Sequence, residues 1–215
     1  WNINSVRIRL EIIKQWIEIK NPDVILLQEI KCKNEDFPEE FFSNLGFKNH
    51  VFGQKGRNGV ATLIKKKFSE NNIVENLNLT ENLDSRIIRI YLEDLDIIIY
   101  NIYAPNGNPM SDKEKFLNKL IWYRKLKELL KIEIEKEKKI IVGGDFNVIE
   151  DENDVNDYTK WINDALGCMQ IRKEFRTILG SGMINIIRNF YHPGEKFSFW
   201  DYQKSSWERN DGLLI

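Results

Sequence analysis

The stretch Ile140-Ile141-Val142-Gly143-Gly144-Asp145-Phe146-Asn147 runs from three apolar residues through two glycines to a carboxylate. A short, continuous apolar run of this kind is typical of a strand that is covered on both faces of its sheet. The glycines let another group approach the backbone closely. A carboxylate at the rim of a buried sheet is costly unless it is paired, hydrogen-bonded or bound to a metal. The stretch therefore predicts a buried strand that delivers Asp145 to a polar site.

Two further buried strands end in the same way. Val24-Ile25-Leu26-Leu27-Gln28-Glu29 ends on a carboxylate. The apolar run Ile97–Ile102 leads into Tyr103-Ala104-Pro105-Asn106-Gly107, which places a phenol and an amide on a turn that proline stiffens. Each residue also has an ordinary structural interpretation, since Glu29 can pair with Lys31, Asp145 can form a turn and Tyr103 can pack in the core. Their order and their shared place at strand ends favour a functional site.

The side chains at these strand ends are oxygen donors, which suit a hard cation such as Mg²⁺ better than zinc. His50 and His192 lie in loop-like segments and lack the spacing of zinc ligands, and His192 is interpreted as a turn residue before proline. Cys32 and Cys168 are far apart in the sequence and predict neither a metal site nor a disulfide framework. This cysteine usage fits a reducing cytoplasm.

Strands alternate with longer amphipathic stretches along the whole chain. Further strands are expected at Val60–Ile64 and Ile87–Leu92. Helical patterns cover Val6–Ile19, Asp112–Lys138 and Ile171–Leu179, and the many charges of the long central stretch are expected to form a solvated helix face. No repeat or low-complexity linker interrupts the pattern. The sequence therefore predicts a single domain over residues 1–215, with layered sheets covered by helices.

Composition narrows the classes of function. The 215 residues include 42% hydrophobic side chains, enough for a folded core. The 32 Lys and Arg against 33 Asp and Glu leave a net charge of -1, which argues against a DNA-coating protein but permits a local basic patch. No apolar run approaches the roughly 20 residues that cross a bilayer, so no membrane role is expected.

Six short motifs occur in order along the chain: Trp1-Asn2-Ile3-Asn4-Ser5-Val6-Arg7, Leu27-Gln28-Glu29-Ile30-Lys31, Gly53-Gln54-Lys55-Gly56, Tyr103-Ala104-Pro105-Asn106-Gly107, Gly144-Asp145-Phe146-Asn147 and Phe197-Ser198-Phe199-Trp200-Asp201-Tyr202. In these motifs and their order the chain resembles the exonuclease III family of the endonuclease/exonuclease/phosphatase superfamily, which includes bacterial abasic-site endonucleases. The resemblance covers essentially the whole chain. The third and last of these motifs point to the exonuclease III branch.

This resemblance implies an α+β fold, a four-layer sandwich in which two mixed β-sheets pack face to face and are flanked by helices. It also implies a magnesium-dependent DNA phosphodiesterase of base excision repair, in which Mn²⁺ substitutes for Mg²⁺. Such an enzyme cleaves 5′ to abasic sites and removes nucleotides from the 3′ ends of duplex DNA. Its expected partner is double-stranded DNA with abasic sites or 3′ ends, and the expected oligomeric state is a monomer.

Site roles follow from the resemblance, position by position. On the metal side it implies Asn2, Glu29, Asp145 and Asn147, with Glu29 as the principal ligand. Asp145 would orient and deprotonate the attacking water, and Asn147 would hold that water or the phosphate. Tyr103 and Asn106 would contact the scissile phosphate, Arg86 the DNA backbone and Trp200 the exposed sugar of an abasic site. A salt bridge for Arg86 and a core position for Trp200 remain alternatives. Alternation along Phe197–Trp200 places Phe197 and Phe199 on one face, and if they pack inward, Trp200 points toward the edge of the site. Asn4 stands where some relatives have an aspartate.

The C-terminus departs from the family pattern. The family closes its site with an Arg-Ile-Asp-type strand and a Ser-Asp-His motif, and Asp211–Ile215 reaches only the start of the first. Neither histidine replaces the second by motif. We therefore expect a domain truncated at both ends, inactive as the fragment 1–215. Two alternatives stay open, namely a degenerate non-catalytic DNA-binding remnant and an inositol or lipid phosphodiesterase of the same superfamily.

Overall fold

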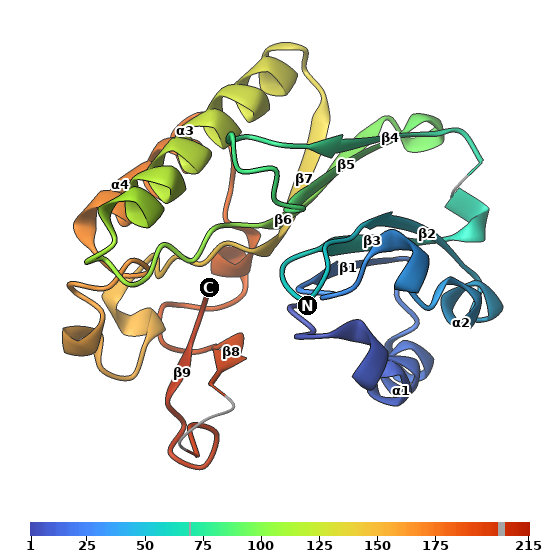
Figure 1. Ribbon diagram of the computed structural model, residues 1–215. Coiled ribbons are helices and arrows are strands. Elements are labelled where there is room, and N and C mark those ends of the chain that lie inside the picture. The colour runs from blue at the N-terminus through green and yellow to red at the C-terminus, as the bar shows by residue number, and fades with distance from the viewer. Residues whose placement is uncertain (69, 202–204) are drawn as a thin grey trace. The chain divides into compact units, whose positions relative to one another are not determined.

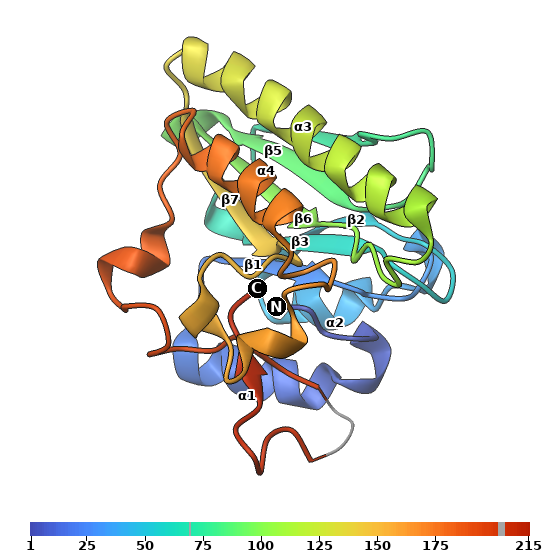
Figure 2. The same ribbon diagram turned by 90° about the vertical axis from the view of Figure 1, so that its left-hand side faces the viewer.

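The computed structural model describes residues 1–68, 70–201 and 205–215, and its chain forms two compact units. The first unit comprises Trp1–Tyr103 and Glu133–Asp145. The second comprises Ala104–Ile132 and Phe146–Ile215. Figures 1 and 2 show the elements of both units from two directions. The expectation of a single domain stays a prediction.

Two β-sheets make up the centre of the first unit. The first sheet has the order β1-β3-β2, with antiparallel neighbours, and Asn2 adds a parallel bridge to Gln28 at the β1 edge. The second has the order β4-β5-β6-β7, in which β6 and β7 are parallel and the other pairs are antiparallel. The strands span Val24–Gln28 (β1), Phe47–Phe52 (β2), Val60–Lys65 (β3), Asn72–Leu77 (β4), Ile87–Leu92 (β5), Ile97–Tyr103 (β6) and Lys139–Asp145 (β7).

Branched apolar side chains hold the two sheets together. Val60 and Ile64 of β3 pack in one cluster with Ile88, Ile90 and Ile99 of the second sheet, and all five side chains are buried. Burying a side chain of this size contributes roughly 1.5–3 kcal/mol. This arrangement explains the continuous apolar run of β3, because strands at the centre of a sandwich are covered on both faces. The run Ile140–Val142, which was also predicted to be covered on both faces, is not: Ile141 is 51% exposed, because β7 lies at the edge of its sheet.

The outer face of the first sheet is covered by α1 (Leu10–Lys20) and α2 (Glu39–Asn44), as Figure 1 shows. Ile13 and Ile17 of α1 are buried in the same cluster as the first sheet. Ile8 and Ile12, which were expected on the same apolar stripe, are instead 74% and 55% exposed. The correction has a simple cause. Ile8 lies in a 3-10 turn (η1, Val6–Ile8) outside the α-helix, which begins only at Leu10, and Ile12 lies beside the buried helical face that Ile13 and Ile17 form.

The second unit contains most of α3 (Lys113–Glu135), whose last turn falls in the first unit, and all of α4 (Met169–Leu179). α3 and α4 lie side by side in both views, and Arg124 pairs with Glu174 at 2.7 Å between them. A short hairpin, β8 (Phe199–Trp200) and β9 (Gly212–Leu213), ends the chain. The remaining 3-10 turns are η2 (Asn34–Asp36), η3 (Lys66–Phe68), η4 (Glu93–Leu95), η5 (Glu152–Asp154), η6 (Tyr158–Lys160) and η7 (Ile186–Asn189).

The observed elements confirm the α+β class, with mixed sheets and flanking helices. The predicted helices at Asp112–Lys138 and Ile171–Leu179 correspond to α3 and α4. Sequence patterns missed β2, β4 and the short α2. In the part of the chain that the structure describes, no helix combines the length and apolarity that crossing a membrane requires.

A buried amide joins the two sheets close to their functional ends. Asn101 of β6 has no exposed surface, and its Nδ2 donates to the Ala61 carbonyl at 2.9 Å and to Thr62 Oγ1 at 3.2 Å in β3. Its Oδ1 accepts a hydrogen bond from Gln28 Nε2 of β1 at 2.7 Å. The polar side chain is therefore satisfied only while the sheets keep this register.

Replacing this amide should destabilise the protein. In Asn101→Leu, the Gln28 amide, the Ala61 carbonyl and the Thr62 hydroxyl lose their hydrogen bonds to Asn101 while they stay buried. Each unsatisfied buried group costs about 1–3 kcal/mol of stability. We expect the free energy of unfolding, measured by urea denaturation, to fall by about 2–5 kcal/mol. The same substitution at exposed Asn71 should change it by less than about 0.5 kcal/mol. Equal effects of the two substitutions would contradict this role for Asn101.

Candidate active site

Two carboxylates converge on one amide in the first unit. Asn2 Nδ2 donates to Glu29 Oε1 at 2.8 Å and to Asp145 Oδ2 at 2.9 Å. Asp145 is 8% exposed, so both negative charges lie in a partly desolvated place. Like charges so close to one another repel, and this repulsion is relieved by hydrogen-bond donors or by a cation.

The register of the strands brings these residues together. Asn2 lies beside Gln28 through the parallel bridge, and Glu29 follows Gln28 directly. In the second sheet, Tyr103 and Asp145 are opposite one another at the ends of β6 and β7. The glycine before Asp145 is required here, because Gly144 has φ +146° and a Cβ would lie 2.0 Å from the Ile102 carbonyl oxygen. The sequence prediction that this position allows a close backbone approach is therefore explained.

Tyr103 completes the cluster as a donor. Its hydroxyl donates to Glu29 Oε1 at 2.9 Å. Burial raises the pKa of Tyr103, and the neighbouring Glu29 carboxylate raises it further. The phenol therefore stays protonated at neutral pH and donates a hydrogen bond rather than accepting a proton. The Arg86 guanidinium lies 4.8 Å from the centre of the Tyr103 ring and pairs with Asp84 at 3.2 Å.

Glu29 is held in its charged form. Burial by itself would raise its pKa, but hydrogen bonds from Asn2, Lys31 and Tyr103 outweigh it, and the pKa is lowered below its ordinary value. Lys31 Nζ lies 2.8 Å from Glu29 Oε2, as the simple ion-pair interpretation predicted, and also donates to Asn4 Oδ1 at 2.5 Å. The site thus combines a stable negative charge with a cation that already compensates it.

The donor set fits a hard divalent cation. Mg²⁺ is commonly bound through one or two carboxylates, with waters and substrate phosphates as its other ligands. Glu29 and Asp145 supply two carboxylates, and Asn2 can supply an amide oxygen. Over residues 1–68, 70–201 and 205–215, no group of three or more His, Cys, Asp or Glu side chains could hold a metal ion. Two carboxylates and one amide are a small set of oxygen ligands, which is typical of magnesium rather than of structural zinc.

Asn106 and Asn147 lie together in the second unit. Asn106 Nδ2 is 3.4 Å from Asn147 Oδ1, and Asn147 Nδ2 donates to the Ala104 carbonyl at 2.8 Å. Asn147 is buried, whereas Asn106 is exposed. The exposed Asn106 amide is thus held by the buried Asn147 side chain, and such an oriented amide can donate to a phosphate oxygen. The assignment of Asn147 to a metal stays a prediction.

Trp200 lies half-buried on β8, in an aromatic group that the sequence did not predict. Its ring centre is 4.7 Å from that of Trp207 and 6.2 Å from that of Phe197. Phe197 and Phe199 were expected to pack inward together, but only Phe199 joins the apolar cluster around Leu213, while Phe197 packs edge-on against Trp200. The two-residue strand is too short to impose alternation on Phe197. Tyr202, the last residue of the predicted motif, lies outside the described residues.

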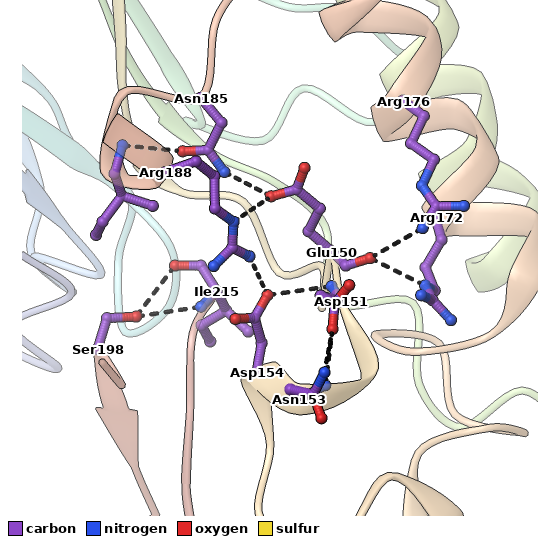
Figure 3. Close-up of polar contacts among 11 residues, drawn as sticks. Glu150, Asp151, Asn153, Asp154, Arg172, Arg176, Asn185, Arg188, Ser198 and Ile215 are labelled. Atoms are coloured by element: carbon purple, nitrogen blue, oxygen red, sulfur yellow. Dashed lines mark hydrogen bonds and ion pairs between the residues drawn. The ribbon is translucent and has the colours of Figure 1, made fainter. Parts of the chain in front are cut away.

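Ion pairs and hydrogen bonds connect this hairpin to the rest of the second unit (Figure 3). Arg188 pairs with the buried Asp154 and with Glu150, whose Oε2 lies 3.2 Å from Arg188 Nε. The Asp154 carbonyl accepts a hydrogen bond from the Leu214 amide at 3.0 Å, next to β9. Ser198 Oγ accepts another from the Ile215 amide at 3.1 Å. The position of Trp200 thus depends on η5 and η7.

One residue that sequence analysis missed is Lys119. It was assigned to a solvated helix face, yet its side chain has no exposed surface. The signal was present in the sequence, because Lys119 falls in the helical spacing of the buried side chains Trp122, Tyr123, Leu126 and Leu130. A lysine on an apolar stripe indicates a specific polar partner inside the fold.

Comparisons with known proteins agree with this arrangement. The chain is 32% identical over 230 residues to exodeoxyribonuclease III of Haemophilus influenzae, and the match covers 100% of this chain and 84% of the relative. The structure of an AP endonuclease from Archaeoglobus fulgidus has a TM-score of 0.88 and 31% identity, over 99% of this chain and 81% of that one. The 3′ phosphatase NExo from Neisseria, solved with a product DNA hairpin, has a TM-score of 0.90 and 26% identity, over 100% of this chain and 82% of that one.

A family model provides the broadest comparison. The model of the Endonuclease/Exonuclease/phosphatase family matches residues 1–215, which is the whole chain. The full-length match to a relative above 30% identity agrees with it. The mixed sheets, which carry carboxylates at their strand ends, are thus found in a chain that matches a known family over its whole length. This chain belongs to the endonuclease/exonuclease/phosphatase family.

Proposed function

We propose that this chain forms most of a magnesium-dependent DNA phosphodiesterase that cleaves 5′ to abasic sites and removes nucleotides from 3′ ends of duplex DNA, an activity that we expect of the full-length protein and not of the fragment 1–215. The observation that carries the proposal is the convergence of Glu29 and Asp145 on Asn2, with the Tyr103 hydroxyl on the same carboxylate. The similarity to proteins named exodeoxyribonuclease III and AP endonuclease supports this substrate class. Enzymes of this family depend on a divalent metal, and the oxygen donors favour magnesium, with manganese as a substitute.

Glu29 and Asn2 would hold the metal in this proposal. The lowered pKa of Glu29 keeps its charge at neutral pH, so no proton has to leave when a cation binds. Asn2 Nδ2 faces both carboxylates and its Oδ1 accepts a hydrogen bond from the Asn4 amide at 3.2 Å, so the side-chain amide would turn over to offer its oxygen to a metal. A bound magnesium ion would stabilise negative charge on the phosphate oxygens.

Asp145 is the proposed base that takes a proton from the attacking water. The Asn2 amide holds one of its oxygens, and the strand end fixes its backbone. Tyr103, which stays protonated, would donate to a phosphate oxygen, and the exposed Asn106 amide would donate to another. Preorganised donors of this kind stabilise the charge that develops on phosphate in the transition state.

Two further contacts to DNA belong to the proposal. Trp200 would lie against the sugar of an abasic site, where the missing base leaves room for an aromatic side chain. Arg86 would reach the DNA backbone, although its pairing with Asp84 supports the structural alternative as well. The expected protein is a cytoplasmic monomer, and the free, buried Cys32 and Cys168 fit a reducing compartment.

The metal assignment predicts the behaviour of Glu29→Gln. The variant keeps the shape and loses the charge, so the dissociation constant for Mg²⁺, measured by calorimetric titration, should rise about 10-fold or more. Thermal unfolding should remain cooperative. Glu35→Gln, at a glutamate that is exposed in the same unit, should bind Mg²⁺ as the unmodified protein does. Unchanged Mg²⁺ affinity in Glu29→Gln would rule out this ligand.

The proposed base predicts the behaviour of Asp145→Asn. Loss of general-base catalysis should lower kcat on an abasic duplex by about 10²–10⁴-fold. Affinity for the same DNA, measured by fluorescence anisotropy in Ca²⁺, should change little because the base acts on water. Asp94→Asn, at an exposed aspartate of the same unit, serves as the control. A variant that loses DNA binding and keeps kcat would show that Asp145 only positions the substrate.

Trp200→Ala should separate abasic cleavage from ordinary 3′-end digestion. Aromatic contacts to nucleic acid are worth about 1–3 kcal/mol, so we expect kcat/KM for abasic cleavage to fall roughly 10- to 100-fold, with a smaller loss for 3′ ends. Phe199→Leu, in the same strand but directed into the apolar cluster, controls for loosening of the hairpin. An equal loss on both substrates, together with a lower Tm, would identify Trp200 as a packing residue.

A further inference from the structure

A lysine ammonium lies at the centre of the second unit. The Lys119 side chain, on α3, is fully buried. Its Nζ donates to the backbone carbonyls of Asn106 at 2.9 Å, Asn147 at 2.6 Å and Ala165 at 2.7 Å. An ammonium group has three protons to donate, and these three carbonyls are suitable acceptors for them. A buried charge is costly, and strong charge-assisted hydrogen bonds offset that cost.

The three carbonyls belong to segments that are far apart in the sequence. Asn106 lies on the loop after β6, Asn147 follows β7, and Ala165 lies on the segment before α4. Two of these residues are the amide pair described above, whose side chains also meet at 3.4 Å. Lys119 therefore joins the backbones of both asparagines at one point, while their side chains meet each other.

The loop is also shaped around the lysine stem. Gly107 has φ +84°, and a Cβ at this position would lie 2.7 Å from Lys119 Cδ and 3.2 Å from Ala165 Cβ. A side chain here would be strained by the backbone conformation and would push against the stem. The glycine that ends the Tyr-Ala-Pro-Asn-Gly motif is thus required by the packing of Lys119 as well as by the turn.

We infer that Lys119 is a positioning residue for phosphate binding, which fixes the backbones of Asn106 and Asn147 so that the exposed Asn106 amide, held by Asn147, is presented to the phosphate. This inference rests on the proposed function. Donors that stabilise a transition state must be held to within about 0.5 Å of their productive place. Lys119 acts through the two asparagines and does not itself touch the substrate. Its removal should therefore affect the rate of the chemical step more than the binding of DNA.

The alternative is that Lys119 only stabilises α3. Leu126 separates the two roles, because it is also fully buried on α3 and lies two turns further along the same helical face. Leu126→Ala leaves a cavity and loosens the helix. It removes none of the hydrogen bonds that fix the asparagine loops. A purely structural lysine would behave as Leu126 does at the same loss of Tm.

The experiment compares Lys119→Met with Leu126→Ala in the intact protein, assayed on an abasic duplex with Mg²⁺. Lys119→Met keeps the length of the stem and removes the ammonium. A misplacement of about 1 Å costs about 10²-fold, so we expect kcat to fall by about that factor while KM changes by less than about 3-fold. Mg²⁺ affinity should change little, because Glu29 and Asn2, the residues proposed to hold the metal, lie in the first unit. Leu126→Ala should keep kcat at a comparable Tm.

A second variant keeps the inference testable if Lys119→Met does not fold. Gly107→Ala leaves the ammonium and α3 in place but pushes the Asn106 loop away from the lysine stem, so it should lower kcat without a matching rise in KM. Equal kcat losses in Lys119→Met and Leu126→Ala at matched Tm, or an unchanged kcat in Gly107→Ala, would overturn the positioning role. If the unmodified protein showed no Mg²⁺-dependent cleavage, the proposed function would fail first and this inference with it.

Discussion

The repulsion between two carboxylates is the constraint on which the first unit depends. Glu29 and Asp145 come from different sheets, yet both accept hydrogen bonds from the same Asn2 nitrogen. Bringing two negative charges together in a partly desolvated place is unfavourable unless donors or a cation compensate them. Here Lys31 and Tyr103 supply part of that compensation on Glu29. Two carboxylate oxygens side by side also suit a divalent metal, which would add positive charge at the same place.

The surrounding fold keeps these strand ends in place. The buried amide of Asn101 fixes the register between the sheets a few residues before the carboxylates, and Gly144 lets β7 approach β6 closely enough for Asp145 to reach the cluster. In the second unit a buried positive charge, rather than a pair of negative charges, organises the polar groups. There, one buried ammonium, that of Lys119, holds neutral carbonyls of three loop segments. Rigid elements thus hold the polar side chains in both units, as a preorganised site requires.

Sequence patterns predicted the long elements well and the short ones poorly. The continuous apolar strands and the two long helices were recognised because their periodicity extends over many residues. β4 and the six-residue α2 were missed, since β4 is largely exposed and α2 is too short to show a stripe. The first helix was predicted to begin at Val6, but Val6–Ile8 forms a 3-10 turn and the α-helix begins at Leu10. Local patterns do not reveal where a helix starts when no capping side chain marks the start.

The sequence by itself determined where most of the apolar strands run and that carboxylates, a phenol and amides stand at their ends, because apolar runs are local properties. It did not determine that β7 is an edge strand with Ile141 exposed. It did not determine that Asn2 joins the two carboxylates, that Lys119 turns inward, or that Trp200 packs against Trp207 rather than standing alone. These features depend on partners that are distant along the chain. Only the register of the sheets and the packing of each unit decide which polar groups meet, because a buried polar side chain takes its place from the hydrogen bonds that tertiary structure offers it.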